Sequence, residues 1–173
     1  ADSVNIPCIL YNVPGRTSLN MEAETTLKLS LHENIIGIKE ASSDLSQITK
    51  IISNTSDSDF RVWSGNDDET FSIMALGGFG VVSVASNIIG NQIKTMMGSI
   101  LEGNIESAAN HHKELLPLFQ GLFWVTNPIL IKRALNISGF NVGGLRLPMV
   151  DSKEFENEFS KLISKYDIDV TKT

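Results

Sequence analysis

The sequence predicts an α/β protein in which buried parallel strands alternate with helices. Two observations support this fold class. Four apolar runs rich in strand-forming residues occur before residue 104, and each precedes a stretch whose apolar residues recur at helical spacing. The runs are apolar along nearly their whole length, as is typical of parallel strands that are covered on both faces. Right-handed crossovers between neighbouring strands then follow from the twist of the chain.

The strands are predicted from short runs of Val, Ile, Leu and aromatic residues that end at turn-forming residues. Pro14-Gly15 closes the first run, and Gly65 closes the third. The four predicted strands are 6–13, 35–41, 60–64 and 80–85.

Helices are predicted where a capping residue precedes apolar positions at helical spacing. Asn20, Asp44 and Asn66 are the candidate N-caps for helices that connect the strands. Residues 1–104 are therefore expected to form the strand and helix units, and residues 105–173 a C-terminal helical segment. The predicted helices are 20–32, 43–54, 66–76, 88–101, 105–124, 128–137 and 151–166.

Four strand and helix units can form either an open doubly wound sheet or half of an eight-unit barrel. The chain starts almost directly with a strand, without a leading helix or an initiating methionine. Its first strand-to-helix loop also lacks the G-x-G-x-x-G pattern that is expected of a dinucleotide-binding sheet. Both observations favour the C-terminal half of a (β/α)8 TIM barrel, strands 5 to 8, followed by the helical segment.

The composition excludes several classes of function. The 173 residues carry a formal net charge of −6, which leaves no basic face for nucleic acid or an anionic membrane. The single cysteine, Cys8, excludes an internal disulfide and a thiolate metal cluster, and it fits a reducing compartment such as the cytoplasm. The longest apolar region, 115–131, is interrupted by Pro117 and Pro128, so no membrane span is expected.

Chemically active side chains follow the predicted strands. Loops after parallel strands meet at one edge of a sheet, so Tyr11, Arg16 and Lys39 are expected to converge. Lys39 ends an apolar strand, where lost hydration favours the neutral, nucleophilic amine. A phenol can move protons, and a guanidinium can hold a carboxylate. The set predicts Schiff-base chemistry, although each residue alone would more often be a solvated or packing side chain.

The spacing of these residues resembles that of a known family. Residues 11–17 read YNVPGRT and residues 37–41 read GIKEA, which places Lys39 28 positions after Tyr11. This pattern resembles the pyruvate-dependent class I aldolases related to N-acetylneuraminate lyase, and among them the dihydrodipicolinate synthases most closely. The similarity covers essentially the whole chain and includes the motifs SGND at 64–67, GFGVVSV at 78–84, NP at 127–128 and LRLP at 145–148.

The resemblance implies a role for each matching residue. Lys39 would form a Schiff base with pyruvate, Tyr11 would transfer protons, and Arg16 would bind the carboxylate of the incoming aldehyde. Val82 would provide a main-chain contact to pyruvate, and Gly65 would line the same opening. The implied reaction condenses pyruvate with L-aspartate 4-semialdehyde to 4-hydroxy-tetrahydrodipicolinate in lysine and diaminopimelate biosynthesis. No metal or organic cofactor is implied, because the imine itself withdraws electrons.

The resemblance also implies parts that this sequence does not contain. In the family, hydroxyl residues from an earlier strand and a tyrosine from a neighbouring subunit complete the site, and both would precede Ala1. The chain is therefore expected to be inactive alone and to need the N-terminal half of the barrel, from the same protein or from another chain. A homotetramer is implied by the resemblance alone.

Two alternative functions are compatible with these residues. A 2-keto-3-deoxy sugar acid aldolase or an N-acetylneuraminate lyase would share Lys39 and Tyr11, whereas Arg16 favours a small aldehyde that bears a carboxylate. A half barrel that has lost its chemistry would act as a binding or assembly module. Pyruvate would then form no adduct on Lys39.

Overall fold

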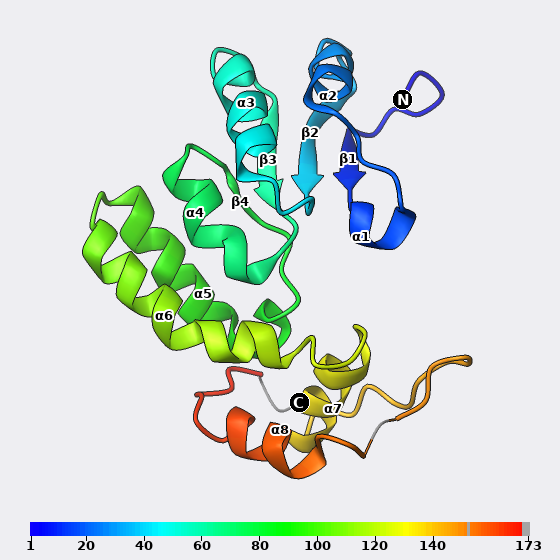
Figure 1. Ribbon diagram of the computed structural model, residues 1–173, viewed down its shortest axis with the longest axis vertical. Coiled ribbons are helices and arrows are strands. Elements are labelled where there is room, and N and C mark those ends of the chain that lie inside the picture. Colours follow the sequence, from blue (N-terminus) through cyan, green and yellow to red (C-terminus); the bar gives the residue numbers. More distant parts are fainter. Residues whose placement is uncertain (152, 171–173) are drawn as a thin grey trace. The chain divides into compact units, whose positions relative to one another are not determined.

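The computed structural model describes residues 1–151 and 153–170 of the 173-residue chain. Contacts within the chain divide it into two units, Ala1–Ser83 and Val84–Thr173. The first unit contains every strand found in the described residues, and the second consists of helices and loops (Figure 1). All of the site residues predicted from the sequence therefore fall in the first unit.

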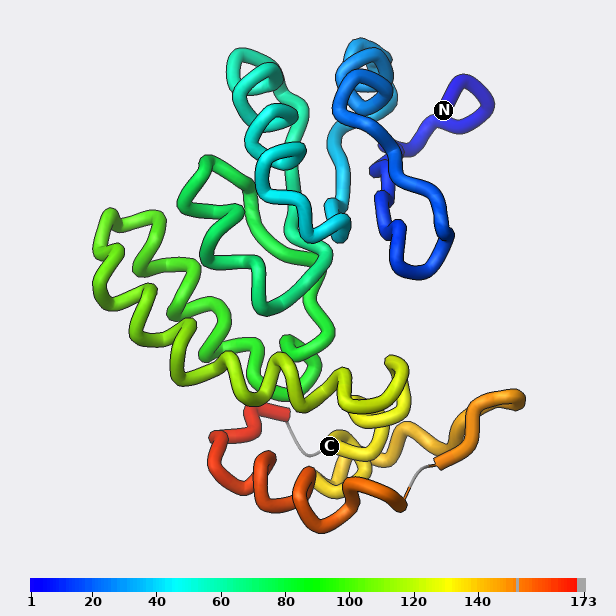
Figure 2. Tube along the Cα trace, in the orientation of Figure 1, coloured from blue at the N-terminus to red at the C-terminus, as the bar shows by residue number. Residues whose placement is uncertain are grey.

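A four-stranded parallel sheet is the framework of the first unit. The strands follow the order β1-β2-β3-β4, so each crossover connects two neighbours (Figure 2). All four predicted strands are confirmed, although the fourth is only two residues long. The strands are β1 (Cys8–Asn12), β2 (Ile35–Glu40), β3 (Arg61–Ser64) and β4 (Gly80–Val81).

Helices connect the strands. The helix α3 (Leu45–Thr55) begins at its predicted cap, because the Asp44 carboxylate accepts a hydrogen bond of 3.0 Å from the Gln47 amide. In contrast, α2 (Ala23–Leu29) begins after Glu22, and the predicted cap Asn20 uses its side chain elsewhere. The other helices of the unit are α1 (Pro14–Thr17), the 3-10 helix η1 (Asp67–Glu69) and α4 (Thr70–Ala75).

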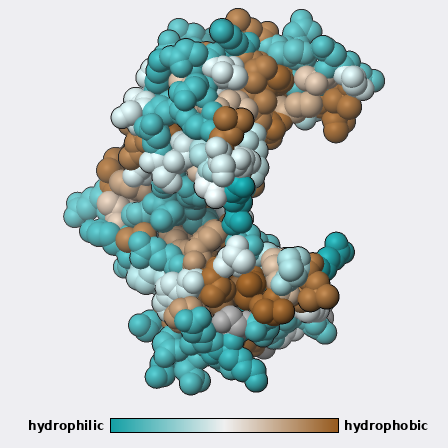
Figure 3. All heavy atoms as spheres, turned by 45° about the vertical axis from the view of Figure 1, so that its right-hand side comes forward, coloured by the Kyte–Doolittle hydropathy of each residue, from teal (hydrophilic) through white to brown (hydrophobic). Residues whose placement is uncertain are grey.

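Helices cover one face of the sheet. α2 and α3 lie side by side, and α3 and α4 both contact β3 (Figure 1). Their apolar side chains pack with Leu10, Ile38 and Val62, which are Cα partners across the first three strands. Because side chains alternate along a strand, the next row points to the other face. Apolar surface also remains visible on this unit (Figure 3, brown, upper part).

Two further rows of residues cross the sheet at its carboxyl end. The open row lies on the face away from the helices and consists of the successive Cα partners Tyr11, Lys39, Trp63 and Gly80. The buried polar row follows it on the helix side and consists of Asn12, Glu40 and Ser64, which are 2%, 0% and 0% exposed. At the carboxyl end of the sheet, one face therefore carries an exposed phenol and an amine, and the other carries buried polar side chains.

The prediction of strands 5 to 8 of a (β/α)8 barrel is wrong as a description of this fold. The structure contains an open four-stranded parallel sheet whose edges, β1 and β4, do not pair with each other. A barrel closes only when strand number, tilt and stagger agree, and four strands of normal twist stay open. Alternation of strands and helices is common to both architectures, so the sequence pattern did not distinguish them.

The second unit is built from helices. α5 packs against α6 and α7, and α6 also packs against α8. No helix in the described part of the chain is long and apolar enough to cross a membrane. Residues 152 and 171–173 of the predicted helical segment lie outside the described residues. The four helices are α5 (Ser86–Leu101), α6 (Ile105–Gly121), α7 (Ile129–Ile137) and α8 (Glu156–Ile163).

Candidate active site

Tyr11 and Lys39 meet on the open row, as the sequence predicts. The parallel register of β1 and β2 makes them Cα partners, and the Lys39 Nζ lies 4.2 Å from the centroid of the Tyr11 ring. This separation is typical of a cation–π contact. The Lys39 side chain is half-buried and Tyr11 is 47% exposed, so a small molecule can reach both. The arrangement places an amine and a phenol where both can act on one carbonyl group.

Trp63 forms the side of the site next to Lys39. It is the Cα partner of Lys39 on β3, and its ring meets Phe79 edge-on, with centroids 5.4 Å apart. The same ring lies over Gly37, where an added Cβ would come within 2.4 Å of the indole. Such a Cβ would also lie 2.2 Å from the Arg61 carbonyl oxygen on β3, so the close approach of this backbone and of the indole requires a glycine two residues before the lysine.

Gly65 and Val82 lie at the carboxyl ends of β3 and β4. The Gly65 amide donates to the Glu40 carbonyl oxygen at 2.6 Å, and an added Cβ would lie 2.6 Å from the Cβ of Ala41. The Val82 amide donates to the Ser64 carbonyl oxygen at 2.9 Å, and its side chain is 44% exposed. Both residues thus follow strands that carry the open row. Their contacts to a substrate stay predictions.

Arg16 lies on α1, the short helical turn after β1. It is exposed, and within residues 1–151 and 153–170 its guanidinium has no hydrogen bond or ion pair. A cavity of about 390 Å³ beside Tyr11 is lined by residues such as Thr17, Leu19 and Met21, and Arg16 is not among them. The structure therefore brings Tyr11 and Lys39 together, whereas Arg16 stays a separate cation near the same strand end.

The sequence analysis missed the buried polar row. Glu40 follows Lys39 and is fully buried, and its carboxylate accepts hydrogen bonds from the side chains of Asn12 and Gln47. Asn12 and Glu40 have the same separation of 28 positions as Tyr11 and Lys39. Asn12 and Glu40 each directly follow a predicted site residue. This repeated spacing of polar residues was visible in the sequence and could have identified the pair.

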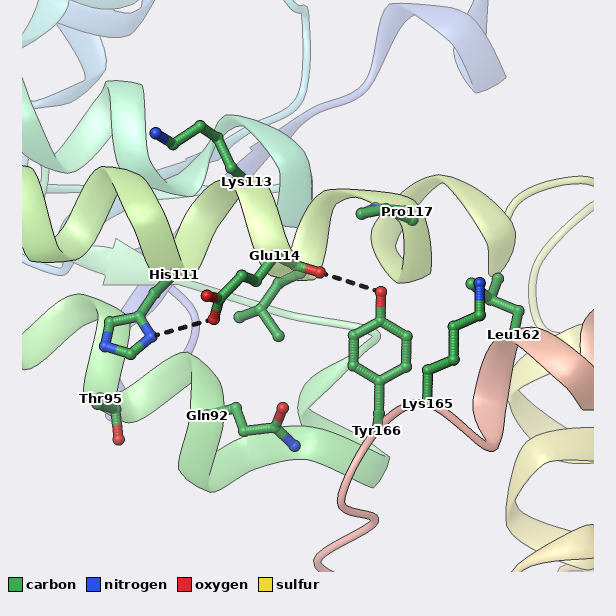
Figure 4. A pocket seen from close by; sticks show the side chains of 10 residues that line it. Gln92, Thr95, His111, Lys113, Glu114, Pro117, Leu162, Lys165 and Tyr166 are labelled. Carbon is green, nitrogen blue, oxygen red and sulfur yellow. Dashed lines mark hydrogen bonds and ion pairs between the residues drawn. The ribbon is translucent and has the colours of Figure 1, made fainter.

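A larger cavity, of about 570 Å³, lies in the second unit and contains none of the predicted site residues (Figure 4). His111 and Glu114 form an ion pair of 3.9 Å there, and the Tyr166 hydroxyl donates to the Glu114 carbonyl oxygen at 3.0 Å. Burial raises the pKa of the Tyr166 phenol above its usual value of 10.0. The polar contacts in this cavity hold helices and the C-terminal segment together. Within the described residues, no three His, Cys, Asp or Glu side chains are grouped to bind a metal.

Comparison with known proteins agrees with the resemblance. The family model described as the dihydrodipicolinate synthetase family matches residues 1–166. A 4-hydroxy-tetrahydrodipicolinate synthase from Dehalococcoides mccartyi strain CBDB1 is 54% identical over 154 residues, which are 89% of this chain and 52% of that protein. The chain thus spans about half the length of the curated relatives it matches.

Solved structures give the same result. The dihydrodipicolinate synthase of Thermotoga maritima is 41% identical, with a TM-score of 0.90 over 95% of this chain and 57% of that chain. A structure described as the first monomeric dihydrodipicolinate synthase variant is also 41% identical, with a TM-score of 0.90 over 95% of this chain and 56% of that chain. Sequence and fold therefore match the same group of proteins.

Proposed function

The chain belongs to the dihydrodipicolinate synthetase family, and from this premise we propose that its Lys39 forms an imine with pyruvate. The observation that carries the proposal is the contact between Lys39 and Tyr11, with the amine 4.2 Å from the centroid of the phenol ring. An amine nucleophile needs a neighbouring group that transfers protons while the amine adds to the carbonyl and while water is eliminated. Tyr11 is the neighbour that meets this requirement.

The proposed reaction begins when the Lys39 amine adds to the C2 carbonyl of pyruvate. Tyr11 passes a proton to the carbonyl oxygen, water leaves, and a protonated imine remains. The imine withdraws electrons, so C3 loses a proton to the Tyr11 phenolate and becomes a nucleophilic enamine carbon. This carbon forms a bond to the aldehyde carbon of the second substrate, and the aldehyde oxygen takes up a proton from Tyr11. The amino group of that substrate then attacks the imine carbon and releases Lys39. No step requires a metal or an organic cofactor.

We propose L-aspartate 4-semialdehyde as the second substrate and 4-hydroxy-tetrahydrodipicolinate as the product, which places the reaction in lysine and diaminopimelate biosynthesis. The names of the curated relatives, 4-hydroxy-tetrahydrodipicolinate synthases, support this choice. The exposed guanidinium of Arg16, which has no partner among the described residues, also supports it, because a guanidinium binds a carboxylate in a two-pronged geometry that a polyol cannot match. A homotetramer is the proposed assembly of the protein.

The imine is tested by trapping it on the full-length protein. Incubation with pyruvate followed by borohydride should leave a stable adduct, and peptide mass mapping should place it on Lys39. The matched control is Lys39→Arg, which keeps the positive charge but supplies no amine that forms an imine. Absence of the adduct in the unaltered protein, or an equal adduct in the Lys39→Arg protein, would refute the proposal and favour a non-catalytic binding module.

A further inference from the structure

A carboxylate is buried beneath the strand ends that carry Tyr11 and Lys39. Glu40 is 0% exposed, and none of the ion pairs found in the described residues includes it. The Asn12 side-chain amide donates to both of its carboxylate oxygens, at 3.0 and 3.2 Å. Burying a carboxylate is costly unless hydrogen bonds compensate. A neutral side chain would fill this position at lower cost, so the carboxylate requires an explanation.

The hydrogen bonds to Glu40 come from three separate parts of the unit. Besides Asn12 on β1, the Ser42 amide donates to Oε1 at 2.8 Å, and the Gln47 side chain on α3 donates to Oε2 at 3.2 Å. The network continues outward, since Asn20 donates to the Gln47 side-chain oxygen at 2.8 Å. The carboxylate thus joins the ends of β1 and β2 to the start of α3.

This network fixes the geometry of the residues on the other face. Asn12 and Glu40 are Cα partners, as are Tyr11 and Lys39 one position earlier. Successive side chains of a strand point to opposite faces, so the backbone that orients Glu40 also orients Lys39. A slip of one residue between β1 and β2 would separate both pairs together. The Ala41 amide adds a main-chain bond of 2.9 Å to the Asn12 carbonyl oxygen at the same level.

We propose that Glu40 and Asn12 are positioning residues, whose hydrogen bonds hold Tyr11 and Lys39 at the separation needed for imine formation. The inference rests on the proposed function, because it assigns the purpose of the buried pair to chemistry at Lys39. Neither residue touches the pyruvate. Their contribution is to keep the amine and the phenol from moving apart.

The acceptor pattern explains why glutamine would not serve at this position. Both carboxylate oxygens act as acceptors: Oε1 receives Asn12 and Ser42, and Oε2 receives Asn12 and Gln47. In Glu40→Gln one oxygen becomes an amino group, which would face hydrogen-bond donors at nearly unchanged volume. The substitution therefore disturbs the network without leaving a cavity.

The kinetic test compares Glu40→Gln with Thr55→Val in the full-length protein. Thr55 is buried in the same unit, and its hydroxyl donates to the Ile51 carbonyl oxygen at 2.9 Å, away from the network. We expect the rate of borohydride-trapped imine at saturating pyruvate to fall roughly 10- to 100-fold in Glu40→Gln, as for a reacting group displaced by about 1 Å. The pyruvate concentration for half-maximal rate should change less than about twofold. Thr55→Val should lower the melting temperature but keep the rate. Equal rates in the two variants would overturn the proposal.

A second readout is independent of the proposed function. In a crystal structure of Glu40→Gln, the distance from the Lys39 Nζ to the Tyr11 ring centroid should exceed the present 4.2 Å by about 1 Å or more. An unchanged distance would overturn the positioning role even if imine formation is slow. If the unaltered protein forms no adduct, the proposed function fails, and this distance still decides the positioning role. Should Glu40→Gln not fold, Gln47→Met removes one donor to the carboxylate, together with the acceptor for Asn20, and serves both measurements.

Discussion

At the scale of single residues, adjacent positions perform different tasks because a strand alternates its side chains. Lys39 faces the open row and Glu40 faces the helices, and the same division separates Tyr11 from Asn12. A short motif such as GIKEA thus contains a chemical residue, a buried acceptor and a glycine on which Trp63 packs. The side to which each position points, or the neighbour that packs on it, explains which residue type stands there.

Arg16 carries the prediction that concerns substrate choice. Replacing it with alanine should raise the KM for aspartate semialdehyde roughly 10- to 100-fold, because a charge-assisted bond to the substrate carboxylate contributes about 1.5–3 kcal/mol. The rate of imine formation with pyruvate alone should stay within about twofold, since Arg16 has no hydrogen bond or ion pair with Tyr11 or Lys39. Steady-state kinetics on the full-length protein test this, with Arg16→Lys as the charge-retaining control. A preference for 2-keto-3-deoxygluconate would instead support a sugar acid aldolase.

At the scale of elements, local sequence patterns predict that a helix or strand exists more reliably than they predict the residues at which it begins and ends. Asp44 caps α3 as expected because its carboxylate meets the Gln47 amide within one turn. Asn20 had the same local signal, but tertiary contacts with Asn12 and Gln47 take its side chain, and α2 starts at Ala23. The short helix α1 was read only as a turn. Such competition between local and distant partners cannot be seen in a linear sequence.

Tyr166 fixes the segment after α8 to α6 and predicts a pH effect. Burial raises the pKa of its phenol above 10.0, so the folded protein keeps this proton at a pH where the unfolded chain has lost it. Stability is therefore complete below about pH 10 and falls as the pH rises through that value and beyond. Thermal unfolding of the full-length protein between about pH 8 and pH 11 should show a steeper decline than that of Tyr166→Phe. Parallel declines would exclude a role for this phenol.

At the scale of the whole molecule, the sequence predicted the four parallel strands and the meeting of Tyr11 with Lys39. Each strand and helix unit is specified locally, by apolar runs and caps. The assignment to strands 5 to 8 of a barrel was wrong, because a barrel depends on the number and stagger of all its strands together, and no single unit encodes it. The buried polar row was missed for a related reason, since its partners are joined only after β1, β2 and α3 have packed.

The proposed assembly is also a property of the whole molecule. Light scattering of the full-length protein should give a native mass of four copies. Large apolar side chains that are widely exposed, such as Leu19 at 75% and Leu31 at 85%, are compatible with association between subunits. The related structure described as a monomeric variant shows that this fold also occurs as a single chain. A native mass of one copy at micromolar concentration would contradict the tetramer.

The shared register of the two pairs has a consequence for how this protein can change in length. Both pairs are set by the pairing of β1 with β2, while the crossover between those strands, residues 13–34, can lengthen or shorten outside them. An insertion in that crossover leaves Lys39 opposite Tyr11 and Glu40 opposite Asn12. A deletion of one residue within either strand would move a donor or a nucleophile to the wrong side of the sheet. The hydrogen-bonded pairing of β1 with β2 thus explains both why changes of length are tolerated in the crossover and why they are not tolerated within the strands.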